Sequence, residues 1–297
     1  MKVLLTGASG QVGRAVQRLA PPGVELAALT HRELDIGEPE AVQAAVASHR
    51  PEVIINAAAY TAVDKAESEP ELAFAINAHG ARYLAQAAAA RPGCRVIHIS
   101  TDYVFDGQSR VPYKPGDATH PLSVYGRSKL EGETEVLKTL RSRATVLRTA
   151  WVYAAQGKNF VLTMLRLMKA NGAVRVVADQ HGSPTEAGSI ARSLWRLAER
   201  PDLQGILHWT DAGETTWYGF ACAIAEEAQA AGLLQGPIQV TPITTADYPT
   251  PARRPANSVL DTRESIARLG IEPEHWRVRL RATLHELSTA AQPGAMP

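Results

Sequence analysis

The chain has 297 residues, 45% hydrophobic and 21% charged, which is typical of a globular protein with one large domain or two closely packed ones. Its formal net charge of +1, from 31 basic and 30 acidic residues, gives no overall attraction for nucleic acid or an anionic membrane. The first residues lack a signal-peptide pattern and no apolar run approaches the roughly 20 residues of a membrane helix, so we predict a cytoplasmic protein.

The first thirteen residues predict a nucleotide-binding turn. An apolar run at residues 3–5 predicts a buried strand, and Gly7, Gly10 and Gly13 follow it at the start of a predicted helix over residues 11–20. Such a turn lets backbone N–H groups approach a pyrophosphate, whose charge the helix N-terminus favours. The spacing G-x-x-G-x-x-G differs from the usual fingerprint, and glycine-rich turns without a ligand are common. The turn is therefore specific only together with residues downstream.

Further strands and helices alternate along the first half of the chain. Strands are predicted at residues 24–29, 53–56 and 95–100, and a long alanine-rich helical run at residues 71–90. Apolar strands separated by helices indicate an α/β fold with a Rossmann-type, doubly wound parallel sheet. Such sheets bind ligands beyond the carboxyl ends of their strands. The segments at that edge are the glycine turn and residues 30–36, 57–61 and 101–103.

The end of the second strand predicts NADPH as the cofactor. An acidic residue at this tip would bind a ribose 2′-hydroxyl, but Thr30 is followed by His31 and Arg32, which suit a 2′-phosphate. NADH is the alternative cofactor, because His31 and Arg32 could equally be solvated loop residues. Asp35 follows, and its neighbour Ile36 could contact the adenine.

A tyrosine and a lysine on one helix predict acid–base chemistry. Residues 106–123 are rich in Gly, Pro and polar residues, which predicts an irregular connection to a helix over residues 125–140. Tyr125 and Lys129 are four apart and share a face of that helix. A lysine ammonium beside a tyrosine would lower the pKa of the phenol and make it a useful proton donor or acceptor. Most such pairs are exposed or only pack, but this one accompanies the glycine turn and Thr101.

These residues together resemble the extended short-chain dehydrogenase/reductase superfamily. The resemblance lies in Gly7, Gly10 and Gly13, in Asn56-Ala57-Ala58-Ala59, in Thr101, and in Tyr125 with Lys129. Within the superfamily, longer stretches resemble the dTDP-4-dehydrorhamnose reductases. They are Gly10-Gln11-Val12-Gly13, AAAYTAVDKAESEPELAFAINA, STDYVFDG, PLSVYGRSKLEGE, RTAWVYAAQGKNFVLTML, VADQHGSPT, TTWYGFA and YPTPARRPANSVLDT, which together run from residue 2 to about residue 262.

The resemblance implies that NAD(P)H reduces the 4-keto group of dTDP-6-deoxy-L-lyxo-4-hexulose to give dTDP-L-rhamnose. Tyr125 would give a proton to the developing alkoxide and Thr101 would hydrogen-bond the same oxygen. Lys129 would stabilise the deprotonated tyrosine and hold the nicotinamide ribose. The predicted cofactor contacts are Gly7, Gly10, Gln11, Val12, Gly13, His31, Arg32, Asp35, Ile36, Ala57, Ala58, Ala59, Tyr60, Thr61, Tyr125 and Lys129.

The second half of the chain is predicted to bind the substrate. Helices are predicted at residues 159–169, 186–200 and 216–231, and a strand at residues 174–178. The resemblance implies a cofactor domain over residues 1–150 and a smaller α-rich substrate lobe over residues 151–297, with some later segments returning to the large sheet. Residues 288–297 are predicted to be disordered.

Five residues are predicted to contact the substrate. They are Thr101, Asp102, Tyr103, Trp151 and Arg254. By similarity to the family, Trp151 packs on the deoxysugar, although a core tryptophan is the commoner case. Arg254 or Arg253 would bind the nucleotide diphosphate, because guanidinium forks suit phosphate oxygens. We favour Arg254, since adjacent residues seldom both face a pocket.

We predict no metal. Some family members bridge a dimer with magnesium, held partly by a glutamate on the first helix where this chain has Ala15. A methyl group cannot bind a hard cation that needs oxygen ligands, so a homodimer would not be metal-bridged. Cys94 and Cys222 fit neither a metal spacing nor a disulfide framework, and we predict buried free thiols.

The motifs are compatible with three other activities. A 4,6-dehydratase would need an acid after the Thr-Asp pair, where this chain has Tyr103. An epimerase would share the fold and the Tyr-Lys pair but would recycle its nicotinamide, so net consumption of NADPH separates it from a reductase. A regulatory subunit that binds nucleotide without catalysis would have no chemical reason to keep Thr101, Tyr125 and Lys129.

Overall fold

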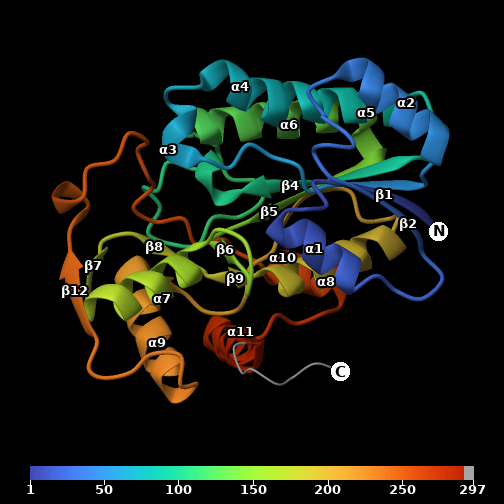
Figure 1. Ribbon diagram of the computed structural model, residues 1–297. Helices are drawn as coiled ribbons and strands as arrows, with labels where there is room; N and C mark the ends of the chain where they lie inside the picture. Colours follow the sequence, from blue (N-terminus) through green and yellow to red (C-terminus); the bar gives the residue numbers. More distant parts are fainter. Residues whose placement is uncertain (291–297) are drawn as a thin grey trace.

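A six-stranded parallel sheet lies at the centre of the computed structural model, which describes residues 1–290 (Figure 1). Its strands are β1 (Lys2–Thr6), β2 (Glu25–Leu29), β3 (Val53–Asn56), β4 (Arg95–Thr101), β5 (Ala144–Thr149) and β10 (Gly205–His208). The order is β10-β5-β4-β3-β1-β2, and every pairing is parallel. The predicted sheet and its first four strands are confirmed. Because β2 and β3 lie on opposite sides of β1, a crevice opens between the ends of β1 and β3.

Helices cover both faces of this sheet (Figure 1). On one face lie α2 (Pro39–His49), α5 (Ala81–Ala89) and α6 (Val124–Leu140); on the other lie α1 (Gln11–Arg18), α8 (Ala187–Glu199) and α10 (Arg263–Leu269). Alternate side chains of β1 enter the two cores, since Leu4 packs toward α2 and Val3 and Leu5 pack toward α1 and α8. Burial on both faces explains why the first strands are continuous apolar runs in the sequence.

The predicted helix over residues 71–90 consists of three segments. An α-helix, α4 (Pro70–Phe74), continues into the π-helix η1 (Ala75–Gly80) and then into α5. The π-turn presents the side chain of Asn77, which accepts from the Tyr60 N–H at 2.8 Å and donates to the Tyr60 carbonyl at 3.1 Å. The same amide donates to Ser128 Oγ at 3.0 Å. Asn77 therefore ties the loop after β3 to α6.

The second half of the chain contains the predicted helices and strand. Helices α7 (Phe160–Asn171), α8 and α9 (Trp217–Ala230) and strand β7 (Ala173–Val177) match the predicted segments. Strand β7 pairs in parallel with β12 (Gln239–Ile243), while β10 and α8 lie against β5 and α1 of the first half. Two small two-stranded sheets join β6 (Val152–Tyr153) to β9 (Thr185–Glu186) and β8 (His181–Gly182) to β11 (Thr215–Thr216).

Two sequence predictions need correction. Helix α11 runs over Trp276–Ala290, so residues 288–290 are helical and not disordered as predicted. Leu280 and Leu284 anchor this helix in a hydrophobic core. The rest of the predicted disordered segment, residues 291–297, lies outside the described residues. The Cys94 thiol is buried, which raises its pKa to about 11, but Cys222 is only half-buried. Both thiols are free.

Across residues 1–290, every helix is too short or too polar to cross a bilayer.

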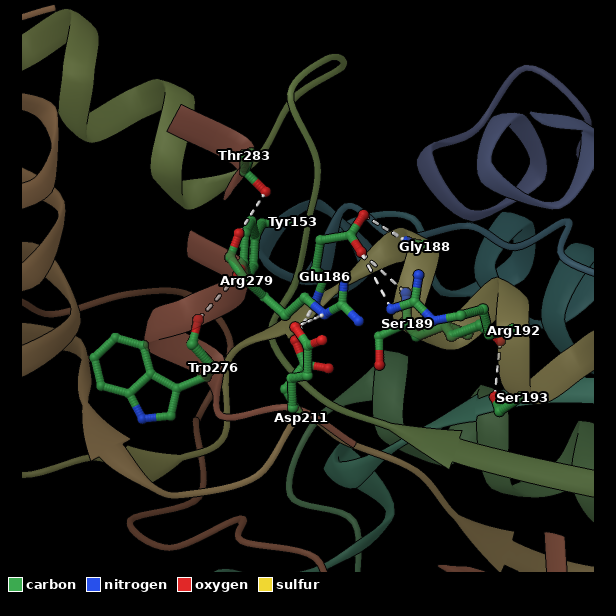
Figure 2. Close-up of polar contacts among 12 residues, drawn as sticks. Tyr153, Glu186, Gly188, Ser189, Arg192, Ser193, Asp211, Trp276, Arg279 and Thr283 are labelled. Carbon is green, nitrogen blue, oxygen red and sulfur yellow. Dashed lines mark hydrogen bonds and ion pairs between the residues drawn. The ribbon is translucent and has the colours of Figure 1, made fainter. Parts of the chain in front are cut away.

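A buried polar cluster joins α11 to α8 and to the loop after β10 (Figure 2). The Asp211 side chain is 1% exposed, and its Oδ2 accepts from the Glu186 N–H at 2.9 Å. The Glu186 carboxylate in turn accepts from the N–H groups of Gly188 and Ser189 at the start of α8. Burial raises the pKa of Asp211 to about 6, although the hydrogen bond from the Glu186 N–H and the charge of Arg279 oppose this rise.

This raised pKa predicts a pH-dependent stability. A carboxyl with a higher pKa in the folded state stabilises the fold while it is protonated, and that contribution is lost as pH rises from its ordinary pKa of 3.8 through about 6. Replacing Asp211 by Asn removes the titrating group. The free energy of unfolding of D211N, relative to the parent protein, should therefore rise by about 2 kcal/mol between pH 4 and pH 7. Urea unfolding across that interval measures the difference.

Asp202→Asn is the matched control. This exposed carboxyl pairs with Arg200, which holds its pKa at about 2, below the tested interval. Parallel pH profiles for D211N and the parent protein would contradict the role assigned to Asp211.

Candidate functional site

A cleft of about 540 Å³ lies at the carboxyl edge of the central sheet. Its walls come from the ends of β1, β3, β4 and β5, from α6, and from the second half of the chain. Most residues predicted from the sequence line this cleft. They are Gly10, Gln11, Val12, Ala57, Ala58, Ala59, Thr61, Thr101, Asp102, Tyr103, Tyr125, Lys129 and Trp151.

The glycine turn forms one end of the cleft, and its spacing follows from its geometry. Gly7 has φ +69°, and a Cβ on it would lie 2.6 Å from the Ala57 backbone. A Cβ on Gly13 would lie 2.2 Å from the Gly7 carbonyl oxygen. Gly10 is the N-cap of α1, whose first N–H groups lack partners within the helix. Glycine at these positions lets backbone and helix N-terminus approach a dinucleotide diphosphate, so this end fits that cofactor.

Thr101 and Asp102 form a hydrogen-bonded pair at the end of β4. Thr101 Oγ1 donates to Asp102 Oδ1 at 2.9 Å and accepts from the Tyr103 N–H at 3.2 Å. Burial raises the pKa of Asp102 to about 6, and the hydrogen bond from Thr101 opposes this rise. Within residues 1–290, Asp102 Oδ2 has no hydrogen-bond partner, which leaves it available to a ligand.

Two hydroxyl groups that the sequence analysis missed also lie on the cleft. Ser100 is the last residue but one of β4 and Thr149 is the last residue of β5, and they are 3% and 4% exposed. Neither hydroxyl has a hydrogen-bond partner among the described residues. Buried polar groups are normally paired, so these two are candidate ligand contacts.

The start of α6 brings Tyr125 against the end of β4. Ser123 caps the helix by accepting from the Gly126 N–H at 3.1 Å. A Cβ on Gly126 would lie 2.3 Å from the Tyr103 carbonyl oxygen, so the helix can sit this close only with glycine there. The Tyr125 and Tyr103 rings meet edge to face with centroids 5.7 Å apart.

The pKa of Tyr125 is raised in this structure and not lowered as predicted, because its hydroxyl is buried. Lys129 is 2% exposed, and its Nζ donates to the Ile99 carbonyl at 2.6 Å. Burial raises the pKa of Tyr125 to about 12, which a Thr101 hydrogen bond only partly opposes. Burial also lowers the pKa of Lys129 to about 8, while Glu133 raises it. Tyr125 is therefore a protonated phenol at neutral pH, ready to donate.

The residues after β2 lie apart from the cleft lining. His31 and Arg32 are exposed, and His31 Nε2 lies 3.9 Å from Asp35 Oδ2. Ile36 is only 2% exposed, because the backbone of Gly80 packs closely against its side chain. A Cβ added at Gly80 would lie 2.8 Å from Ile36 Cδ1. Little of the Ile36 side chain is left for an adenine.

Glu33, an acidic residue near the end of β2, was not identified from the sequence. Glu33 accepts hydrogen bonds from both the N–H and the hydroxyl of Thr30, each at 2.8 Å. These bonds from Thr30 hold the pKa of Glu33 below its usual value. The β2 tip thus carries both a carboxylate and the guanidinium of Arg32.

Replacing Arg32 by Ala tests the predicted preference for NADPH. A guanidinium that contacts the 2′-phosphate contributes a charge-assisted hydrogen bond, so its loss should raise the Kd for NADPH about tenfold or more. The Kd for NADH, which lacks that phosphate, should change little. Fluorescence titration with both cofactors measures this, and equal losses would exclude a 2′-phosphate contact by Arg32.

Aromatic rings form the opposite end of the cleft. The Trp151 ring stacks on Trp217 with centroids 3.5 Å apart and planes 4° apart, and Phe160 lies 4.6 Å from Trp217. A Cβ on Gly182 would lie 2.3 Å from the Trp151 ring, so the indole is held between Trp217 and Gly182. Trp151 has φ +47°, a costly conformation that packing must maintain. The roles of Trp217 and Phe160 were missed because no local pattern marks them.

Arg254 lies outside the cleft lining. Its Nη2 is 2.7 Å from Asp64 Oδ2 and its Nη1 is 3.0 Å from Asp64 Oδ1, a two-pronged ion pair. Arg253 and Arg254 both line a neighbouring hollow of about 490 Å³ with Tyr248. The predicted diphosphate contact therefore requires Arg254 to leave Asp64 or to bind beside it.

The described residues offer no cluster of three or more His, Cys, Asp and Glu side chains that could hold a metal ion. Ala15 is 5% exposed and packs in the core between α1 and the sheet.

Comparisons with known proteins agree on one family. A family model described as "RmlD substrate binding domain" matches residues 1–289. The dTDP-4-dehydrorhamnose reductase of Aggregatibacter actinomycetemcomitans is 46% identical over 287 residues, covering 94% of this chain and 97% of that protein. A probable dTDP-4,6-dihydroxy-2-methyloxan-3-one 4-ketoreductase of Streptomyces antibioticus is 43% identical over 295 residues, covering 99% of this chain and 98% of that protein.

Solved structures give the same result. A dTDP-4-dehydrorhamnose reductase of Clostridium acetobutylicum ATCC 824 superposes with a TM-score of 0.90 at 40% identity, covering 97% of this chain and 99% of that one. The Bacillus anthracis str. Ames enzyme, solved in complex with NADP, has a TM-score of 0.90 at 34% identity, covering 96% and 99%.

Proposed function

The chain belongs to the RmlD substrate binding domain family, and from this premise we propose that it reduces the 4-keto group of dTDP-6-deoxy-L-lyxo-4-hexulose to dTDP-L-rhamnose with NADPH. One observation carries the proposal. Thr101, Tyr125 and Lys129 meet on the wall of a single cleft that ends at the glycine turn. Relatives at 46% and 40% identity named dTDP-4-dehydrorhamnose reductase support it. NADH is the alternative cofactor.

A nicotinamide cofactor held at the glycine turn would supply the hydride for the sugar C4 carbon. Tyr125, which burial keeps protonated, gives its hydroxyl proton to the C4 oxygen as negative charge develops there. Thr101 donates to Asp102 in this structure, and its hydroxyl proton turns toward the sugar oxygen to stabilise the same charge. The ammonium of Lys129 then stabilises the tyrosine phenolate until solvent returns the proton.

The two halves of the chain divide the work. We propose that residues 1–150 bind the cofactor and that the substrate lies against later residues, among them Trp151, Phe160 and Trp217. We also propose that the protein acts in the cytoplasm on its dTDP-linked sugar, with neither nucleic acid nor a membrane as a partner. Its net charge of +1 supports this. A homodimer, where one forms, is not metal-bridged, because the buried Ala15 offers no ligand.

A second candidate is reduction of a different dTDP-linked keto sugar. The Streptomyces antibioticus relative, at 43% identity, carries the name of a 4-ketoreductase for another sugar. The aromatic wall of Trp151, Trp217 and Phe160 suits the face of any deoxysugar with few hydroxyl groups.

An assay of the purified protein distinguishes these candidates. We expect NADPH absorbance to fall in step with consumption of dTDP-6-deoxy-L-lyxo-4-hexulose, and more slowly with other dTDP-4-keto sugars. Conversion without net loss of NADPH would indicate an epimerase. Binding of NADPH without turnover of any sugar would indicate a regulatory subunit.

A further inference from the structure

The cleft must hold phosphate groups but offers few cations. A dinucleotide cofactor and a dTDP-sugar each bring a diphosphate. Among the described residues that line the cleft, the only basic side chains are Lys129 and Lys158, and Asp102 is the only acidic one. Lys129 is 2% exposed and its Nζ is bound to the Ile99 carbonyl, next to Thr101 and Tyr125. Lys158 is exposed and free to meet a phosphate.

The loop that carries Lys158 is fastened to the glycine turn. Gln11 Nε2 donates to the Lys158 carbonyl at 3.5 Å, and Asn159 Nδ2 donates to Gln11 Oε1 at 2.8 Å. Gly157 has φ +89°, and a Cβ on it would lie 3.1 Å from Gln11 Cγ. Asn159 also caps α7 by accepting from the Leu162 N–H at 3.0 Å. The backbone of Lys158 is thus fixed between the N-termini of α1 and α7.

This placement puts the exposed side chain of Lys158 beside the glycine turn, on the lining of the same cleft. The N-terminus of α1 presents backbone N–H groups and a partial positive charge, but its first turn carries no charged side chain before Arg14. Arg14 is engaged elsewhere, since its Nε donates to the Ser9 carbonyl at 2.9 Å. The ammonium of Lys158, on a flexible side chain, supplies the full positive charge that the N-terminus of α1 lacks.

We infer that Lys158 binds the diphosphate of the nicotinamide cofactor and closes the second half of the chain onto the glycine turn. This inference rests on the proposed use of a dinucleotide cofactor. The nearby Gln11 contact favours the cofactor diphosphate over that of the dTDP-sugar. Because Trp151 and Phe160 flank Lys158 in sequence and line the same cleft, cofactor binding also steadies the aromatic wall.

Binding measurements on Lys158→Gln and Lys158→Arg test the inference. Loss of one charge-assisted hydrogen bond should raise the Kd for NADPH about tenfold in K158Q, while K158R should stay within about threefold of the parent protein. The Kd for dTDP, measured in separate titrations, should change less than about twofold. Added salt should weaken NADPH binding more in the parent protein than in K158Q, because screening acts on the charge that Lys158 supplies.

Lys169→Gln is the matched control. Lys169 is exposed in the last turn of α7, away from the cleft lining, so this variant loses the same charge and should bind NADPH normally. An unchanged Kd for NADPH in K158Q, or a loss of dTDP binding with NADPH binding intact, overturns the inference while the proposed reductase stands. Failure of the parent protein to bind NADPH overturns both.

Discussion

Replacing Tyr125 by Phe is expected to lower kcat by about 10²-fold or more, because the variant keeps the aromatic ring but loses the proton that the sugar oxygen needs. The ring contact with Tyr103 should survive, so the fold of the cleft is preserved. The Kd for NADPH should stay near that of the parent protein. Steady-state rates of NADPH oxidation and a separate cofactor titration measure the two effects.

Tyr83→Phe controls for the loss of a hydroxyl group. Tyr83 lies on α5 and is not part of the cleft lining, so its variant should keep the parental kcat. If kcat of Y125F is also unchanged, Tyr125 is not the proton donor. A large rise in the Kd for NADPH would instead mean that the substitution disturbs cofactor binding.

Replacing Glu133 by Ala is expected to destabilise the fold by about 3–5 kcal/mol, since it leaves a buried guanidinium without its counter-ion. Arg148 on β5 donates from Nη2 to Glu133 Oε2 at 2.7 Å and from Nε to Oε1 at 2.9 Å. Both side chains are 2% exposed. Urea unfolding measures the loss, and activity is a poor substitute because Glu133 also raises the pKa of Lys129.

Two further variants show whether the stability loss in E133A comes from leaving a buried charge unpaired. Glu264→Ala breaks an ion pair with Arg268 on the surface, where such pairs contribute about 0–1 kcal/mol, and it should cost no more than that. The double variant Glu133→Leu/Arg148→Met removes both buried charges and should recover most of the stability lost by E133A. A single-variant loss as small as that of E264A would show that water reaches Arg148.

This ion pair also explains why β5 was not predicted from the sequence. All six residues of β5 are buried, but Arg148 interrupts the apolar run that identified β1, β3 and β4. Its charge is balanced by Glu133 on α6, a pairing that no local pattern reveals. Strand β10 was also missed, and it ends at the buried polar residue His208, whose ring contacts the Tyr113 carbonyl at 3.0 Å.

The three proposed catalytic residues could be predicted from the sequence, but the direction of the Tyr125 pKa shift could not. Thr101, Tyr125 and Lys129 occur in recognisable motifs, and the structure brings them to one wall of the cleft. The protonation of Tyr125 depends on its burial, and the Lys129 ammonium donates to the Ile99 carbonyl. Burial and backbone partners of this kind arise only when distant segments pack.

Long-range partners account for the other differences at the site. Arg254 is held by Asp64, which lies 190 positions earlier, so its two-pronged ion pair leaves no trace in the proline-rich segment around it. The stacking of Trp151 on Trp217 likewise joins two motifs whose sequences carry no mark of each other.

The late return of β10 to the sheet has a consequence for synthesis of the protein on the ribosome. Strand β5 ends at Thr149 and β10 at His208, so the 59 residues from 150 to 208 must be made before the sheet is complete, which takes roughly 3–12 s at about 5–20 residues per second. Until then the nascent chain exposes the edge of an apolar strand and the α1 face that α8 covers. An open edge of this kind invites pairing with other chains. During each round of translation, the growing polypeptide therefore passes through an interval of seconds in which its own later residues do not yet cover this edge.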